Sequence, residues 1–151
     1  MSGKYNFGVV GYCPPSHFDE DEAKIMINKG FDQISTNHPD AEINIVSGLT
    51  NVGVLAIAYE EAQKRGWKTS GIACKKAEEY PLFPVDDKKI VGENWGDESQ
   101  TFINSIDGIL RVGGGPQSKQ EVRLVREKGG EVIEFELALI TEETREKISD
   151  L

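Results

Sequence analysis

Short β-rich apolar runs alternate with amphipathic helical patterns along nearly the whole chain of 151 residues. The β-rich runs predict strands at 5–12, 42–48, 67–74, 89–93, 107–112 and 131–137. Apolar residues at helical spacing predict helices at 19–36, 51–66, 97–106 and 116–128, and 141–151 reads as a polar terminal helix. Strands that alternate with helices in this way are typical of a parallel sheet covered by helices on both faces. We therefore predict a single doubly wound α/β domain over residues 1–151, with a mostly parallel sheet.

Local signals mark the ends of the first two predicted helices. Ser16 and Asp19 have the spacing of a capping box, with Asp in place of the usual Glu. Gly66 is a stop signal for the second helix, whose inner face is predicted to include Leu55. The segment 75–89 contains two prolines, so we expect an excursion at the surface there.

The composition excludes several classes of partner. Lys and Arg total 17 against 26 Asp and Glu, which gives a net charge of −9. Because an acidic chain without a basic patch repels polyanions, we expect no nucleic acid and no membrane as partner. No apolar run approaches the roughly 20 residues of a membrane span. The N-terminal MSGKYNFGVV also lacks the apolar core of a signal peptide.

The cysteines and histidines point to a protein without a metal site. Cys13 and Cys74 lie far apart without Cys-x-x-Cys spacing, which suggests reduced thiols in a cytoplasmic setting. His17 and His38 are single residues in loops and lack the spacing of metal ligands. We therefore predict a cytoplasmic protein with neither a metal site nor a resident cofactor.

Three strand-to-helix loops form the candidate site. Ligands of doubly wound sheets bind beyond the carboxyl ends of the strands, where the strand order reverses. The loops 11–18, 47–53 and 113–121 would meet there. Turn geometry explains each loop alone, but three such loops at one edge favour a bound anion. The predicted ligand-binding residues are Gly11, Tyr12, Gly48, Thr50, Asn51, Gly53, Gly113, Gly114, Gly115, Gln117, Ser118 and Lys119.

The stretch RVGGGPQSKQE (111–121) carries the most specific signal. Its glycines allow positive φ and a close approach of the backbone to a ligand. The helix that follows offers unpaired N–H groups and a partial positive charge, which suit a phosphate. Ser118 can donate a hydrogen bond, and Lys119 supplies charge. Neither a Walker A motif nor G-x-G-x-x-G after the first strand is present, which argues against a P-loop kinase or a nicotinamide-dependent dehydrogenase.

The same stretch resembles P-G-G-x-G-T-x-x-E, the hallmark of the Rossmann-like lysine-decarboxylase-like superfamily. Gly114 and Gly115 match, Ser118 stands for the Thr, and Glu121 falls on the Glu. This superfamily includes the cytokinin-activating phosphoribohydrolases and the molybdenum-cofactor carrier proteins. The resemblance implies a Rossmann-like fold and a site for a small-molecule nucleotide.

A second family segment is similar to SGLTNVGVLAIAYEEAQKRG (47–66). In the family a Gly-rich turn is followed by G-L-M-G and an Ala-rich helix, and Gly48, Gly53 and Ala62 match that pattern. Proteins of the family are commonly dimers. Because Val52 and Ile57 are apolar and lie outside the predicted inner face of their helix, we predict a homodimer or larger assembly.

The resemblance also implies roles for individual residues. In the phosphoribohydrolases the Glu stabilises positive charge on the ribose as the N-glycosidic bond breaks, so Glu121 is the predicted catalytic residue. The helix dipole alone would also favour a Glu in this first turn. Gly113 replaces the family's Pro, and Gln117 replaces its last Gly. The family's Arg-Lys pair, which supports catalysis, falls on Glu98 and Ser99, so an acid replaces a cation.

Two functional hypotheses follow. In the leading one the chain binds a phosphorylated nucleoside and hydrolyses the N-glycosidic bond of a nucleoside 5′-monophosphate. Residues 113–118 then hold the phosphate, and Glu121 acts near the ribose. In the alternative the chain is a non-catalytic carrier or sensor of a nucleotide or cofactor, which the missing Arg-Lys pair favours. A structural subunit with an empty site is a third, weaker hypothesis.

Each of four residues near the predicted site is open to two interpretations. Cys13 either faces the site or is a buried structural residue. Trp95 either stacks on a base or covers the core. Asp97 and Glu98 either complement the dipole of the helix that follows or take part in catalysis, as their alignment with the family implies.

Overall fold

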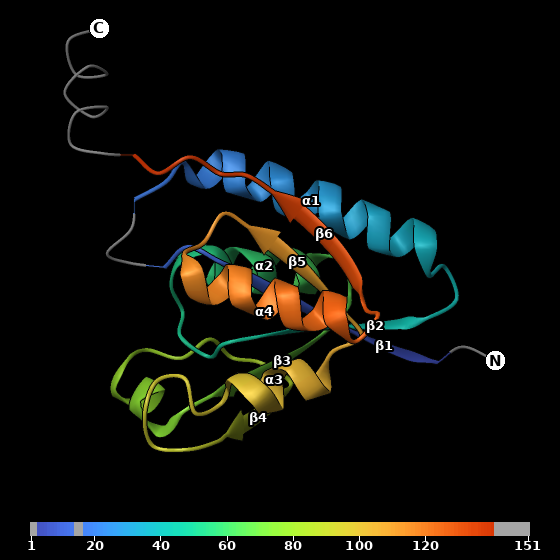
Figure 1. Ribbon diagram of the computed structural model, residues 1–151. Coiled ribbons are helices and arrows are strands. Elements are labelled where there is room, and N and C mark those ends of the chain that lie inside the picture. Colours follow the sequence, from blue (N-terminus) through green and yellow to red (C-terminus); the bar gives the residue numbers. More distant parts are fainter. Residues whose placement is uncertain (1–2, 14–16, 141–151) are drawn as a thin grey trace, which may run out of the picture.

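Strands and helices alternate in the order that the sequence predicts (Figure 1). The computed structural model describes residues 3–13 and 17–140. The strands are β1 (Lys4–Gly11), β2 (Glu42–Ser47), β3 (Lys68–Ala73), β4 (Asp87–Ile90), β5 (Gly108–Val112) and β6 (Glu131–Phe135). The helices are α1 (Glu20–Asn37), α2 (Gly53–Lys64), α3 (Ser99–Ser105) and α4 (Pro116–Glu127), with a 3-10 helix, η1 (Lys75–Glu79), after β3.

The described strands form one sheet in the order β4-β3-β2-β1-β5-β6, and every neighbouring pair is parallel. From β1 the chain moves outward through β2, β3 and β4, then crosses to β5 on the other side of β1. Gly11, at the end of β1, pairs with Val112, at the end of β5. The structure therefore confirms the predicted Rossmann-like, doubly wound α/β fold. Its topological switch point lies at the carboxyl ends of β1 and β5.

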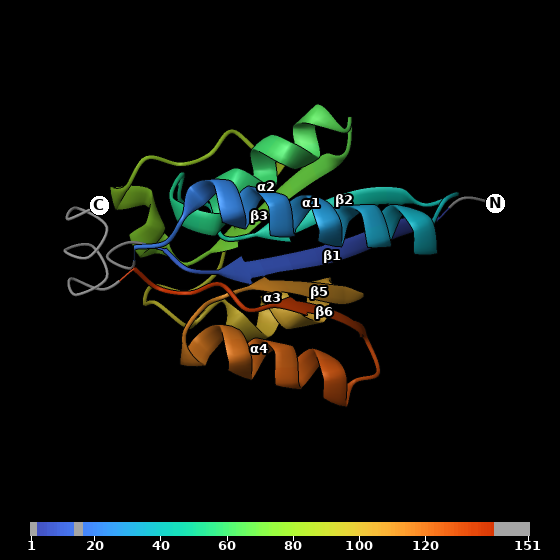
Figure 2. The same cartoon turned by 90° about the horizontal axis from the view of Figure 1, so that it is seen from above.

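Helices cover both faces of the sheet (Figure 2). α1 and α2 pack on one face, where Phe7 and Leu110 are fully buried. α3 and α4 pack on the other face, where Ile109 is fully buried and contacts Val122 and its neighbours. Because adjacent residues of a strand point to opposite faces, Ile109 and Leu110 belong to different core layers. Burial on both faces explains why the central strands read as continuous apolar runs.

The start of α1 differs from the predicted capping box. Asp19 is itself the N-cap, and its carboxylate accepts a hydrogen bond from the backbone N–H of Glu22 at 3.0 Å. The predicted place of Asp19 inside the first turn is therefore wrong, because a single Asp can cap the helix alone. Ser16 and the predicted helix at 141–151 lie outside the described residues.

The edge strand β4 lies at Asp87–Ile90, shifted from the predicted 89–93. Its first three residues are charged and exposed, and only Ile90 is partly buried. Charged side chains on an edge strand discourage pairing with other chains, but they also remove the apolar pattern by which a strand is predicted. Within the described part of the chain, no helix combines the length and apolarity that crossing a bilayer requires.

Candidate functional site

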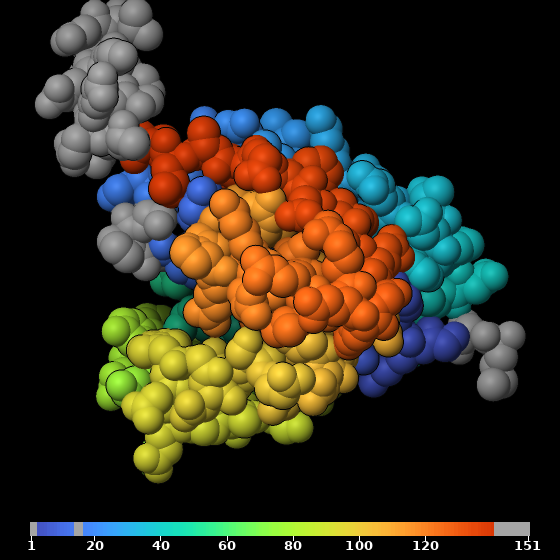
Figure 3. Space-filling model, viewed as in Figure 1, coloured from blue at the N-terminus to red at the C-terminus, as the bar shows by residue number. Residues whose placement is uncertain are grey.

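A pocket of about 520 Å³ opens at the carboxyl edge of the sheet, beside the switch point. The ends of β1, β2 and β3, the starts of α2 and α4, and the segments around η1 and before α3 supply its lining. The volume falls within the roughly 300–1,000 Å³ of small-molecule sites. In Figure 3 the green atoms near the start of α2 lie recessed between orange α4 and the yellow-green segment that precedes α3.

Gly11 allows β1, β5 and α2 to approach one another closely beside the pocket. A Cβ on Gly11 would lie 2.4 Å from the carbonyl oxygen of Val112 and 2.7 Å from the side chain of Val54. The next residue, Tyr12, accepts a hydrogen bond on its carbonyl oxygen from the N–H of Val54 at 2.9 Å. The start of α2 is thus fixed to the end of β1.

Gly113 and Gly114 form the turn that leads from β5 into α4. Their φ angles are +64° and +98°, which side chains other than glycine rarely adopt. A Cβ on Gly113 would lie 2.4 Å from the ring of Tyr12, and one on Gly114 would lie 2.5 Å from Oγ of Ser118. Both glycines are therefore needed by the turn itself, and neither lines the pocket.

The N-terminus of α4 faces the pocket with Gly115, Gln117 and Ser118. Gly115 is the N-cap, in extended conformation, and Pro116 occupies the first turn. Within the described residues, the N–H groups of Gln117 and Ser118 donate to no protein acceptor. Unpaired N–H groups at a helix N-terminus, together with the helix dipole, attract anions.

The N-terminus of α2 forms a second wall. Val52 is the N-cap and makes no side-chain capping hydrogen bond. A Cβ on Gly53, whose φ is +62°, would lie 2.4 Å from the carbonyl oxygen of Tyr12. Gly53 therefore serves the packing of α2 against β1, and the lining of this wall comes from Gly48, Thr50 and Val52.

The buried side chain of Tyr59 holds the 47–53 loop in position. Its hydroxyl lies 2.5 Å from the carbonyl oxygen of Gly48 and 2.8 Å from that of Ser70 on β3. On the other side of the loop, the N–H of Asn51 donates to the carbonyl of Pro81 at 2.9 Å. The loop is therefore held between β3 and the segment after η1.

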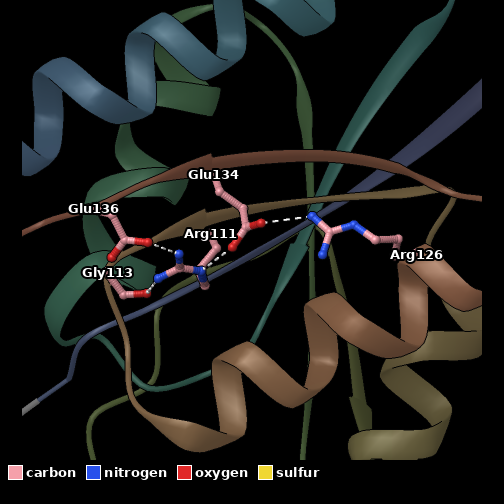
Figure 4. Close-up of polar contacts among 5 residues, drawn as sticks. All are labelled: Arg111, Gly113, Arg126, Glu134 and Glu136. Atoms are coloured by element: carbon pink, nitrogen blue, oxygen red, sulfur yellow. Dashed lines mark hydrogen bonds and ion pairs between the residues drawn. The ribbon is translucent and has the colours of Figure 1, made fainter.

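Arg111 supports the glycine-rich turn from the side on which Glu134 and Glu136 lie (Figure 4). Its buried guanidinium donates from Nη1 to the carbonyl oxygen of Gly113 at 2.9 Å and pairs through Nε with Glu134 at 2.7 Å. Nη2 pairs with Glu136, which is largely exposed, and Arg126 of α4 pairs with the other oxygen of Glu134 at 2.9 Å. The hydrogen bond from Arg111 holds the pKa of Glu134 below its ordinary value. The network ties the turn to β6 and α4.

Glu121 reaches the pocket from the second turn of α4 and is 7% exposed. Its Oε2 lies 3.4 Å from Oγ of Ser99, at the start of α3. Burial raises the pKa of Glu121 to about 7, and the charge of Glu98 acts in the same direction, while the hydrogen bond from Ser99 opposes both. The two positions that align with the family's Arg-Lys pair, Glu98 and Ser99, therefore do lie beside Glu121.

The segment before α3 brings an aromatic residue to the pocket. Trp95 lines it and is 54% exposed, so the interpretation that it covers the core is wrong. Tyr80 lines the pocket beside it, with ring centroids 6.1 Å apart. Asp97 instead accepts hydrogen bonds from the N–H groups of Glu93 and Asn94, so it stabilises the turn rather than lining the pocket.

The structure brings part of the predicted site together. The predicted residues that line the pocket are Gly11, Gly48, Thr50, Gly115, Gln117, Ser118 and Glu121. Those that do not line it are Tyr12, Asn51, Gly53, Gly113, Gly114 and Lys119. Of the second group, Gly53, Gly113 and Gly114 serve the turns, Tyr12 packs against the core, and Asn51 and Lys119 are exposed. Cys13 lines the pocket, as one of its two interpretations predicted.

Sequence reasoning missed most of the apolar lining. Leu49, Leu55, Ala77 and Phe102 line the pocket together with Tyr80. The sequence predicts Leu55 on the inner face of α2, because it shares the helical spacing of the core residues there. No pattern in the sequence distinguishes an apolar residue that lines a cavity from one that fills the core.

No family model matches the sequence, and no curated protein does either. Solved structures do share its fold. The molybdenum cofactor carrier protein from Chlamydomonas reinhardtii matches at 23% identity with a TM-score of 0.67, over 87% of this chain and 76% of that one. The molybdenum cofactor binding protein from the phototrophic bacterium Rippkaea orientalis matches at 21% identity with a TM-score of 0.70, over 97% of this chain and 85% of that one.

These matches confirm, at the level of the fold, the resemblance that the glycine-rich motif indicates. Both similar proteins are named for the molybdenum cofactor.

Proposed function

We propose that this protein is a non-catalytic carrier or sensor of a phosphorylated, nucleotide-like small molecule. One observation carries the proposal: the pocket at the switch point lies against the N-terminus of α4, whose N–H groups at Gln117 and Ser118 donate to no acceptor among residues 3–13 and 17–140. The phosphate would bind there, beside Gly115. That solved structures of the same fold are named as a carrier and as a binding protein of a cofactor supports the same class of function.

The charges of the pocket favour carriage over catalysis. Among the described residues that line it, none is Lys or Arg, and the acids Glu98 and Glu121 supply the charge. In the phosphoribohydrolases that the sequence resembles, an Arg-Lys pair supports bond cleavage. Without a cation to stabilise the leaving group, the site is suited to hold a ligand rather than to cleave it.

A second candidate function keeps the hydrolysis of a nucleoside 5′-monophosphate. It is favoured by Glu121, which is buried, lines the pocket and has a pKa raised to about 7 by burial. Two carboxyl groups in different environments can divide the roles of acid and charge stabiliser, as in glycoside hydrolysis. In this reading Glu121 acts beside the ribose.

One experiment tests both functions. The protein is titrated by calorimetry with a panel of nucleoside 5′-monophosphates and with the matching nucleosides, and the same mixtures are analysed chromatographically for free base. A carrier binds the monophosphates at least tenfold more tightly than the nucleosides and releases no base. Release of base above the background rate, lowered about 100-fold or more in Glu121→Gln, would establish the hydrolase instead. Equal affinity for nucleosides and monophosphates would contradict a phosphate site at α4.

A further inference from the structure

The loop between β4 and α3 projects from the carboxyl edge of the sheet, beside the pocket (Figure 1). Its tip carries Trp95, which lines the pocket although 54% of it is exposed. Among the described residues, Trp95 packs against none of the apolar clusters that form the core. A movement that covered the ring would be favourable, because burial of apolar surface stabilises the state that achieves it.

The turn that carries Trp95 is braced internally. The carboxylate of Asp97 accepts hydrogen bonds from the N–H groups of Glu93 at 3.1 Å and Asn94 at 3.0 Å. The N–H of Asp97 donates in return to the carbonyl oxygen of Asn94, also at 3.0 Å. These bonds close residues 93–97 into one unit, so a movement of the loop would carry Trp95 as part of a rigid body.

Hydrogen bonds do not tie this unit to the sheet, within the part of the chain that the structure describes. Every hydrogen bond of residues 93–96 ends at a residue between 93 and 99. The ring of Trp95 approaches that of Tyr80 with centroids 6.1 Å apart and an inclination of 50°. Segments with few buried contacts change conformation at a low cost in free energy.

Both ends of the unit have the features of a hinge. On one side Gly92 has a φ of +76°, and its carbonyl oxygen accepts the N–H of Lys75 at 2.9 Å, so the chain is fixed up to this residue. On the other side Glu98 is the N-cap of α3 and makes no side-chain capping hydrogen bond. Loop glycines and the ends of helices are typical positions at which a hinge absorbs changes of backbone angle.

Tyr80, which also lines the pocket, lies on a segment that is anchored instead. Its N–H donates to the carbonyl oxygen of Ala77 at 3.1 Å. The carbonyl oxygen of the next residue, Pro81, accepts the N–H of Asn51 at 2.9 Å. The two exposed rings therefore differ in freedom, because Tyr80 belongs to a fixed wall and Trp95 to a unit that can move.

We propose that residues 92–98 form a lid, hinged at Gly92 and Glu98, that moves Trp95 over the mouth of the pocket. The free protein samples the closed state, and a bound molecule stabilises it, because the indole covers that molecule only when the lid is closed. Closure excludes water and slows release. The inference rests on the proposed function only in that the pocket takes a small molecule, whatever its chemistry.

NMR relaxation dispersion of the protein without ligand tests the movement directly, because lids move on the microsecond-to-millisecond timescale. The indole N–H of Trp95 and the amides of residues 93–97 should show exchange at one common rate, as expected of a rigid unit. The indole N–H of Trp67, which packs against the core, should give a flat profile. A flat profile at Trp95 would overturn the lid, whatever the pocket binds.

Binding kinetics test whether closure accompanies the entry of a ligand. Trp67→Phe leaves Trp95 as the only tryptophan, and its fluorescence is followed by stopped flow on mixing with AMP or GMP. A lid gives a fast phase whose rate rises with nucleotide concentration and a slower phase whose rate levels off. A single phase that rises linearly with concentration would overturn closure and make Trp95 a fixed wall. If neither nucleotide binds, the proposed function fails, while the dispersion measurement still decides on the lid.

Two substitutions with the same change of charge isolate the brace. Asp97→Ala removes it, so the slower phase should be lost and the bound nucleotide should dissociate about fivefold faster or more. In Glu93→Ala the exposed side chain is lost, but the backbone N–H that bonds to Asp97 remains, so dissociation should change less than about twofold. Equal acceleration in the two variants would contradict the braced lid.

Discussion

The guanidinium of Arg111 on β5 donates a hydrogen bond to the carbonyl oxygen of Gly113, only two residues further along the chain, at 2.9 Å. The same guanidinium is buried and pairs with Glu134 of β6 and with Glu136, which follows that strand. The conformation of the glycine-rich turn therefore depends on an ion-pair network that does not itself line the pocket. Substitutions in this network should change ligand binding without touching the ligand.

Arg111→Met should lower the free energy of unfolding by about 2–3 kcal/mol, because partly buried Glu134 loses its shortest partner. The exposed pair with Glu136 adds little. Affinity for the phosphorylated ligand should fall at least threefold in the folded variant, because the Gly113 carbonyl loses its donor. Arg126→Met is the matched control, since it removes the other cation on Glu134 but leaves the turn in place. Urea unfolding and calorimetry measure both effects, and equal losses of affinity in the two variants would contradict the role of Arg111.

Gly114 and Gly115 are neighbours with different roles: the turn requires a glycine at 114, whereas Gly115 lines the pocket. A Cβ on Gly115 meets no atom within 4 Å, and its φ of −93° suits any residue. Gly115→Val should therefore fold with nearly unchanged stability, yet its side chain should weaken phosphate-ligand binding more than tenfold, about 1.4 kcal/mol. A folded Gly115→Val with unchanged affinity would show that the phosphate is held elsewhere.

Gly114→Ala should show the opposite pattern. With φ at +98° and Oγ of Ser118 2.5 Å from the new Cβ, the substitution strains the turn and should cost about 1–3 kcal/mol of stability. Thermal unfolding measures this cost, and an unchanged melting temperature would mean that the turn adapts. Larger side chains at Gly114 are poor probes of binding, because they disturb the fold first.

Glu121 should make stability depend on pH. Its pKa, raised to about 7 from an ordinary 4.5, means that the folded protein holds a proton that the unfolded chain releases in this interval. The free energy of unfolding therefore falls as pH rises from about 4.5 to 7, and the full cost, roughly 3 kcal/mol, is present above pH 7. Glu121→Gln should be more stable than the parent above pH 7 and lose this advantage at low pH.

Urea unfolding between pH 4 and pH 8 checks whether the free energy of unfolding falls as pH rises. The fall should occur between roughly pH 4.5 and 7, the interval set by the two pKa values. Glu127→Gln, exposed on the same helix, should retain the pH dependence of the parent. A Glu121→Gln variant that still follows the parent's pH profile would show that Glu121 is not the group responsible.

Tyr59→Phe should loosen the second wall of the pocket. Its hydroxyl can donate to the carbonyl oxygen of Gly48 or to that of Ser70, both partly buried, so its removal takes away this donor and should cost about 1–2 kcal/mol. Amide hydrogen exchange should rise locally, in residues 48–53 and 69–71. Exchange that rises evenly over the whole sheet would indicate a general loss of stability instead.

The fold could be predicted because its signals are local and repeated. Period and composition identify the buried strands, and Gly66 ends α2 with a φ of +76°, as its position after the apolar pattern predicts. The predicted position of β4 differs from the observed one because the charged residues of this strand face solvent at the sheet edge. The predicted homodimer stays a prediction. Val52 lines the pocket and Ile57 packs against the core, so these residues no longer support it.

The site was harder to predict than the fold, because a residue belongs to the site only if it faces the pocket. Gly113 and Gly114 lie in the predicted loop, but they face Tyr12 and Ser118 rather than the pocket. Tyr80 and Trp95 come together only when the excursion after β3 folds back beside the start of α3. Such long-range contacts leave no spacing in the sequence from which they could be inferred.

The strand order has a consequence for how the molecule is made. β1 is synthesised well before its partner β5, which begins only at Gly108, so one edge of the central strand stays unpaired until β5 follows. An unpaired strand edge invites association with other chains, and contacts between distant segments form slowly. The pocket, built where β1 meets β5, comes into existence only when this last docking step is complete, and a bound ligand would then hold the two halves together.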